Sequence, residues 1–204
     1  MSSVILIGGF VEIVELCQDN DISIAGVIDQ SIADIEPGLK YLGTDDEIGT
    51  LISKISNIPL VITPDNPNIR QKLFSYYSSF GLSFASIVSK KAVISKSAAL
   101  GIGNVIQAGV NVSSKVITGN FVKINSQANL MHHCSVGDFT TIAPSAVVLG
   151  RVTIGKNCYI GANSTILPNI CICDNVVIGA GSVVTKDINT PDTTFLGIPA
   201  RQHV

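Results

Sequence analysis

Two adjacent histidines are the residues of this chain whose chemistry is easiest to name. The sequence contains three histidines, and His132 and His133 stand next to each other in the segment 129–134. A neutral imidazole can accept a proton near neutral pH, so a histidine in a fixed position is a candidate general base. A solvated surface histidine is the other interpretation, and the elements that hold the pair decide between the two.

A six-residue repeat surrounds the histidines. Every sixth position from Ile94 to Val184 is Ile, Leu or Val, except for Thr118. This period matches neither a helix nor a single strand, and it is typical of a solenoid whose short strands each place one aliphatic residue inside. The repeat has no insertion between residues 92 and 185, so no long loop is expected to leave the coil. Glycine often follows the aliphatic position, which suits a sharp corner or a positive φ: Gly101, Gly119, Gly137, Gly155, Gly161 and Gly179.

The repeat places the histidines at a corner of the coil. Leu130 and Val136 are interior positions, so His132 lies between two strands and is expected to face outward. Three hexads make one triangular coil, so Gly150, 18 residues later, is expected to stack on His132. A glycine leaves its backbone N–H unobstructed. A base next to an oxyanion donor is the pair of groups that acyl transfer needs.

The residues before the coil predict a small α/β domain. Residues 3–7, 22–28 and 60–63 have the apolar runs of buried strands, and residues 11–17 and 47–55 have the spacing of helices. A third helix is predicted from Pro67 to about Tyr77, after the start signal Asp65-Asn66-Pro67. This order indicates a Rossmann-like domain with a short parallel sheet over residues 1–88, followed by the coil over residues 89–204.

The first two strands have the layout of a mononucleotide-binding half. Gly8 and Gly9 follow the first strand, and Asp29 ends the second, where an acid can accept hydrogen bonds from a ribose or a base. An Asp at a strand end is equally often a simple turn residue. The full G-x-G-x-x-G motif is absent, because residues 10–13 contain no glycine. The pattern therefore favours a nucleotide-linked sugar over NAD.

Composition excludes several classes of protein. The net charge is −2 and no basic run is present, so a nucleic-acid partner is not expected. No apolar stretch reaches the roughly 18 residues of a membrane span, and the start has no signal-peptide pattern, so a cytoplasmic protein is expected. The five cysteines are odd in number and fit buried free thiols, and no metal site is expected.

The end of the chain carries a family resemblance. The segment from Ile154 to Val184 resembles the hexapeptide acyltransferases, and the closing Gly197-Ile198-Pro199-Ala200-Arg201 resembles their G-x-P-A-[KR] ending. Together with the small α/β domain and the insertion-free coil, the whole chain resembles the bacterial sugar acetyltransferases of the bacillosamine, perosamine and sialic acid O-acetyl type. The resemblance implies that the coil is a left-handed parallel β-helix.

The resemblance also implies an activity. It implies a homotrimer that transfers an acetyl group from acetyl-CoA to the 4-amino group of a nucleotide-linked 4-amino-4,6-dideoxy sugar, by direct attack on the thioester. By analogy, His132 is the base and the Gly150 N–H holds the oxyanion. The residues implied along acetyl-CoA are Thr141, Gly150, Ala162, Ala180 and Arg201, the last of which also fits a solvated tail residue. The residues implied at the nucleotide sugar are Gly8, Gly9, Phe10, Asp29, Gln30 and Asn125.

Two departures from the family stand out. His133 occupies the catalytic position where relatives usually carry an acid that orients the base, and the glycine loop near Phe10 is about two residues short. Three alternatives share the coil: O-acetylation of a sugar hydroxyl, a zinc lyase with three histidines per metal, and a non-catalytic trimer that binds a sugar nucleotide. The sequence does not identify the sugar, the nucleotide or the pathway.

Overall fold

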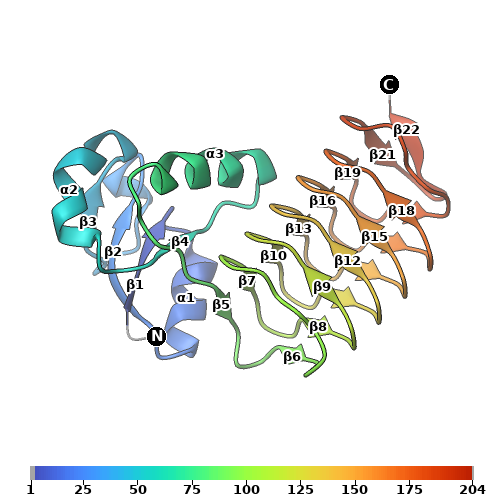
Figure 1. The fold of residues 1–204 in the computed structure, drawn as a ribbon, viewed down its shortest axis with the longest axis horizontal. Coiled ribbons are helices and arrows are strands. Elements are labelled where there is room, and N and C mark those ends of the chain that lie inside the picture. The colour runs from blue at the N-terminus through green and yellow to red at the C-terminus, as the bar shows by residue number, and fades with distance from the viewer. Residues whose placement is uncertain (1–2, 204) are drawn as a thin grey trace.

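The computed structural model describes residues 3–203, which form an α/β domain followed by a coil of stacked short strands (Figure 1). Residues 1, 2 and 204, at the ends of the two predicted domains, lie outside the described residues. The predicted fold class is confirmed: a parallel α/β sheet domain precedes a left-handed β-helix. No helix within residues 3–203 is long and apolar enough to cross a lipid bilayer.

The first domain is a four-stranded parallel sheet with helices on both faces. The sheet order is β3-β2-β1-β4. Val4 and Leu6 pack on the face covered by α1, whereas Ile5 and Ile7 belong to the core on the opposite face. The sequence analysis missed the edge strand β3. The elements are β1 (Ser3–Ile7), α1 (Val11–Asp19), β2 (Ser23–Ile28), β3 (Tyr41–Gly43), α2 (Ile48–Ile55), β4 (Leu60–Ile62) and α3 (Pro67–Ser78), with short 3-10 helices at Ile32–Asp34 and Asp45–Glu47.

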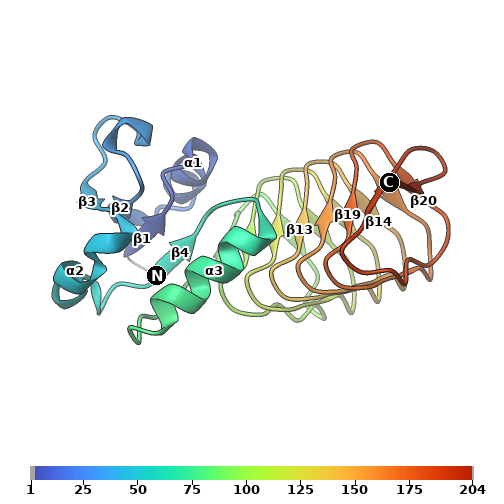
Figure 2. The same ribbon diagram turned by 90° about the horizontal axis from the view of Figure 1, so that it is seen from above.

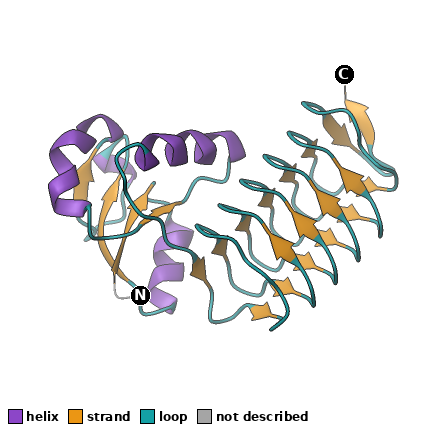
Figure 3. Cartoon of the chain, in the orientation of Figure 1, coloured by secondary structure: helices purple, strands orange, loops and turns teal. Residues whose placement is uncertain are grey.

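The coil has three sides, each a ladder of short strands that are parallel except for the last strand of side 1 (Figure 3). Side 1 contains β5 (Ile87–Val88), β7 (Val105–Ile106), β10 (Lys123–Ile124), β13 (Thr141–Ile142), β16 (Tyr159–Ile160) and β19 (Val177–Ile178), and it ends with β21 (Thr194–Leu196) and β22 (Arg201–His203). Side 2 contains β6 (Val93–Ile94), β8 (Asn111–Val112), β11 (Asn129–Leu130), β14 (Val147–Val148), β17 (Thr165–Ile166) and β20 (Val183–Val184). Side 3 contains β9 (Ile117–Thr118), β12 (Ser135–Val136), β15 (Thr153–Ile154) and β18 (Cys171–Ile172).

The predicted register is confirmed. Each strand from β5 to β17 pairs with the strand 18 residues later, as Lys123 does with Thr141 and Asn129 with Val147. At the end of the coil the spacing shortens to 17, where Val177 pairs with Thr194. Thr118, the one polar residue of the aliphatic series, is buried, and its hydroxyl accepts a 2.8 Å hydrogen bond from the amide of Asn104. The side-chain oxygen of Asn104 accepts in turn from the backbone N–H of Val122, so this polar pair is satisfied inside the coil.

The glycines that follow interior positions are required for close approach and not for positive φ, which corrects that part of the expectation. A Cβ atom on Gly137 would lie 2.6 Å from the carbonyl carbon of Gly155 in the next coil. The left-handed conformation falls instead three residues before each interior position from Ile106 to Val184. His133 (φ 61°) and Arg151 (φ 61°) adopt it there, and so does a series of asparagines: Asn157, Asn163, Asn169 and Asn175.

A buried arginine joins the two domains. Arg70 lies on α3, which runs along the start of the coil (Figure 2). Arg70 is 1% exposed, and its guanidinium donates to the carbonyls of Phe121, Phe139, Pro64 and Asp65. The rings of Phe121 and Phe139 stack on each other at 5.4 Å beneath the helix. These contacts hold the first domain over side 1 of the coil.

We expect Gly137→Ala to destabilise the protein by about 1–3 kcal/mol, because the added methyl group overlaps backbone that cannot move independently. The control is Gly49→Ala in α2, where a Cβ atom meets nothing within 4 Å. Alanine there should be neutral or stabilising, by up to about 1 kcal/mol. Urea unfolding of both variants tests this expectation, and equal midpoints would contradict the stacking constraint.

Candidate active site

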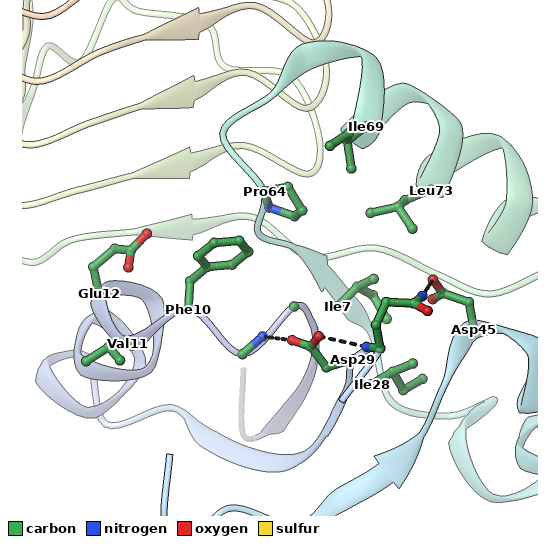
Figure 4. Close-up of a pocket in the computed structure, with 13 residues that line it drawn as sticks. Ile7, Phe10, Val11, Glu12, Ile28, Asp29, Asp45, Pro64, Ile69 and Leu73 are labelled. Carbon is green, nitrogen blue, oxygen red and sulfur yellow. Dashed lines mark hydrogen bonds between the residues drawn. The ribbon is translucent and has the colours of Figure 1, made fainter. Parts of the chain in front are cut away.

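A cavity of about 610 Å³ opens at the carboxyl ends of β1, β2 and β4 (Figure 4). Gly8, Gly9 and Phe10 come from the loop after β1, and Asp29 and Gln30 follow β2. Ile69 and Leu73 of α3 point into it from the opposite wall. Ligands bind at this edge of parallel α/β sheets. The structure therefore brings together five of the six residues predicted to contact the nucleotide sugar.

Asp29 braces the glycine loop. One carboxylate oxygen accepts a 2.7 Å hydrogen bond from the Gly9 N–H, and the other accepts a 2.7 Å hydrogen bond from the Gln30 N–H. The sequence leaves open whether Asp29 binds a ligand or only holds a turn, and these two hydrogen bonds show it holding the turn. Each oxygen retains a further lone pair that can face the cavity. Gly8 has φ +97°, and a Cβ atom there would overlap the hydroxyl of Thr63, so the loop requires glycine.

Asp45 is a cavity residue that the sequence analysis missed. Its carboxylate accepts a 2.8 Å hydrogen bond from the Gln30 side-chain amide and another from the hydroxyl of Tyr77. Asp45 starts a short helical turn before α2, where its sequence resembles an ordinary helix start. Only the parallel order of the strands brings it to the end of the cavity.

A buried lysine lies between the cavity and the coil. The Lys123 side chain is 2% exposed, and its ammonium contacts Asp65 at 2.9 Å and the backbone carbonyl of Thr63 at 2.7 Å. Glu12, on the cavity wall, lies 3.7 Å from the same ammonium. Burial alone would raise the pKa of Asp65, but the charge and hydrogen bond of Lys123, the hydrogen bond from Asn125 and the charge of Arg70 together lower it. Sequence spacing could not reveal this pair, because its members are distant in the chain.

Asn125 and Thr141 both contact the same aspartate. The Asn125 amide donates to the Asp65 carboxylate at 3.1 Å, and the Thr141 hydroxyl donates to the Asp65 carbonyl at 2.6 Å. Asn125 is 4% exposed, and its side-chain oxygen is buried without a hydrogen-bond partner in the part of the chain that the structure describes. This oxygen is an acceptor available to an amine or hydroxyl donor.

His132 and His133 lie where sides 2 and 3 of the coil meet. We call this edge the histidine corner, and it comprises residues 114–115, 132–133 and 150–151. His132 is half-buried and His133 is exposed, with their Nδ1 atoms 3.1 Å apart. A Cβ atom on Gly150 would lie 2.8 Å from His132 Nε2, so the ring covers Gly150 as the register predicts.

The backbone N–H of Gly150 is an open donor. At the corner between sides 3 and 1, equivalent N–H groups are capped by the side chain 18 residues later, as Asn120 is by Asp138 and Lys156 by Asp174. The residue 18 positions after Gly150 is Pro168, whose side chain has no acceptor. Within residues 3–203, the Gly150 N–H has no hydrogen-bond partner. The corner thus presents an imidazole and a free donor side by side.

The remaining predicted cofactor residues lie elsewhere. Ala162 and Ala180 stack at the corner between sides 1 and 2, and Arg201 is exposed on β22. In one chain, the first domain contacts side 1 through Asp65 and Lys123, whereas His132 lies at the corner opposite side 1. A single chain therefore does not bring the cavity and the histidine together.

Comparisons with known proteins agree with this architecture. Residues 151–186 match the family described as bacterial transferase hexapeptide (six repeats). The chain is similar to PerB from Caulobacter crescentus, solved in complex with CoA and GDP-perosamine, at 25% identity and a TM-score of 0.92 over 100% of this chain and 98% of that one. No curated protein matches the sequence.

Two further structures extend the likeness. The acetyltransferase domain of PglB from Neisseria gonorrhoeae, in complex with acetyl coenzyme A, is 23% identical, with a TM-score of 0.87 and 98% of each chain covered. WeeI from Acinetobacter baumannii is 24% identical, with a TM-score of 0.87 over 99% of this chain and 100% of that one. The repeat matched over residues 151–186 and this full-length likeness agree on one fold, an α/β domain followed by a hexapeptide-repeat coil.

Proposed function

We propose that this protein transfers the acetyl group of acetyl-CoA to the 4-amino group of a nucleotide-linked 4-amino-4,6-dideoxy sugar. The observation that carries this proposal is the pairing of His132 with the open N–H of Gly150. The likeness to PerB, solved with CoA and GDP-perosamine, supports the substrate class. The cavity beside the glycine loop is the place for the nucleotide.

His132 acts as the general base in this proposal. We assign its Nδ1 proton to the hydrogen bond with His133 Nδ1, which leaves the lone pair of Nε2 free beside Gly150. Nε2 takes a proton from the sugar amine as the nitrogen attacks the thioester carbonyl carbon. The Gly150 N–H donates to the oxyanion that forms. When the carbon–sulfur bond breaks, His132 returns the proton to the leaving thiolate.

His133 replaces the expected acid as a neutral acceptor. Partial desolvation lowers the pKa of His133, and the charges of Lys115, His132 and Arg151 lower it further. A histidine whose pKa lies below its ordinary value is neutral at neutral pH, so its Nδ1 can accept from His132. It orients the base as a carboxylate would, but it gives no charge stabilisation to the imidazolium.

The site is completed by a second copy of the chain. Arg70 and Lys123 hold the cavity over side 1, and His132 lies at the opposite corner, so each chain supplies half of a site to each neighbour. A closed ring of three copies uses both halves of every chain. This is the homotrimer that the family resemblance implies, with acetyl-CoA in the groove between coils.

Thiol release from acetyl-CoA, measured against UDP-, GDP- and dTDP-linked 4-amino sugars, tests the reaction. We expect release with one nucleotide sugar, and a loss of kcat/KM of roughly 10²–10⁴-fold in His132→Ala. His203→Ala, which changes the exposed third histidine on β22, should retain full activity. Full activity in His132→Ala would contradict the proposed base. Release with a hydroxyl sugar alone would reject the amine as acceptor.

The pH dependence of kcat/KM tests the role of His133. A carboxylate beside His132 stabilises the protonated base, so His133→Glu should move the acid limb of the profile to higher pH. His133→Asn is the matched control, since asparagine occupies the same left-handed position at Asn157 and keeps a neutral acceptor. We expect its profile to stay near that of the parent protein. Identical profiles for the Glu and Asn variants would show that residue 133 does not contact the base.

A further inference from the structure

Three side chains form a basic ladder along the histidine corner. Lys115, His133 and Arg151 are 18 residues apart, and all three are exposed with left-handed backbone (φ 57°, 61° and 61°). Backbone hydrogen bonds link the three turns, from the His133 N–H to Ser114 at 3.0 Å and from the Arg151 N–H to His132 at 3.0 Å. The ladder therefore passes directly beside the proposed base.

Two members of the ladder, Lys115 and Arg151, are cationic side chains. In the described part of the chain, neither Lys115 nor Arg151 forms an ion pair. Between residues 89 and 186 the only acids are Asp138 and Asp174. Both lie at a different corner, where they cap backbone N–H groups. Two unpaired cations beside a reaction centre form a site for an anion.

The cavity has the opposite charge. Its lining includes Glu12, Asp29 and Asp45 and contains no lysine or arginine. Two buried cations lie outside this lining, and both have partners: Lys123 contacts Asp65 and Glu12, and Arg70 donates to backbone carbonyls. A nucleoside diphosphate in this cavity would lack a cationic partner within its own chain.

The two domains show the same asymmetry as a whole. Residues 1–88 contain 11 acidic and 4 basic residues, whereas residues 89–204 contain 4 acidic and 9 basic residues. The acidic domain of one copy and the basic coil of the next are therefore electrostatically complementary. This complementarity favours the arrangement in which the histidine corner faces the cavity of a neighbour.

We propose that Lys115 and Arg151 of one copy bind the diphosphate of the nucleotide sugar held in the cavity of the next copy. The inference rests on the proposed function and adds the group that neutralises the substrate. One sugar ring separates the reacting amine from the diphosphate, so a base and a diphosphate site belong close together. In acetyl-CoA, by contrast, the pantetheine arm separates the phosphates from the thioester that reacts beside His132. The phosphates of the nucleotide sugar are therefore the ones expected close to the ladder. The guanidinium of Arg151 can bind phosphate oxygens through two parallel hydrogen bonds.

Binding measurements on the intact oligomer test this inference. UDP, GDP and dTDP are titrated by calorimetry into the parent protein and into Lys115→Gln and Arg151→Gln, with uridine, guanosine and thymidine as phosphate-free probes. We expect each variant to bind the preferred diphosphate about tenfold more weakly, with unchanged affinity for its nucleoside. Lys54→Gln, which removes an exposed lysine from α2, is the matched control and should bind like the parent.

Several outcomes would overturn the inference. These are equal diphosphate affinity in parent and variants, an equal loss for the nucleoside, and failure of the parent to bind any of the three diphosphates. A rise in the KM for acetyl-CoA with an unchanged KM for the nucleotide sugar would assign the ladder to the cofactor instead. The binding assay needs no turnover, so a selective loss of diphosphate affinity supports the ladder even if no amino sugar accepts the acetyl group.

Discussion

The stacking of each residue on the one 18 positions later is the constraint on which the rest of the structure depends. Because the register has no insertion, a residue's neighbours along a corner are set by position alone. The same stacking that forbids a side chain at Gly137 puts Gly150 under the His132 ring. It also lines up Lys115, His133 and Arg151 at one corner. The residues of the candidate site on the coil are thus spaced one coil, or 18 residues, apart.

The second constraint is the attachment of the first domain. Arg70 is buried where α3 meets the coil, and Lys123 is buried where the loop after β4 meets side 1. Removing one partner of such a buried polar contact is costly, so the domain cannot swing around the coil to reach its own histidine corner. In the proposed function, this attachment keeps the cavity away from the histidine corner of its own chain, so a neighbouring copy supplies the base.

Much of the fold and one half of the site can be predicted from the sequence, for a physical reason. In a solenoid, neighbours in space are a fixed distance apart in the chain, so counting from His132 finds Gly150 and counting from Ile94 finds the core. The first domain follows ordinary helix and strand periodicity, and its glycine loop and Asp29 stand at strand ends as expected. Of the four strands of this domain, only β3 was not predicted, because a three-residue edge strand at Tyr41–Gly43 is too short to show a hydrophobic pattern.

The remaining features depend on contacts that no spacing encodes. Asp65 contacts Lys123, which is 58 positions later in the chain. Asp45 contacts Gln30, in the loop after β2, and Tyr77, on α3. The left-handed backbone at His133 can be predicted only by noting that asparagines occupy the equivalent position in other turns of the coil. The acidic residues of the cavity and the basic residues of the corner can be read from the sequence. That they lie apart within one chain follows only from the three-dimensional arrangement of the sides of the coil.

The central claim, that cavity and base come from different copies, is tested most directly by mixing two inactive variants. His132→Ala keeps the cavity, and Ile69→Trp fills the cavity from an exposed position on α3 while keeping the histidine. The two proteins are dissociated, mixed in equal amounts and reassembled, and thiol release is measured. If sites are shared between copies, about a quarter of the parent activity should be recovered. In random assemblies, half of the copies supply an intact base and half supply an open cavity, so about one site in four has both. Activity that stays at the level of the separate variants would show that one chain holds the whole site.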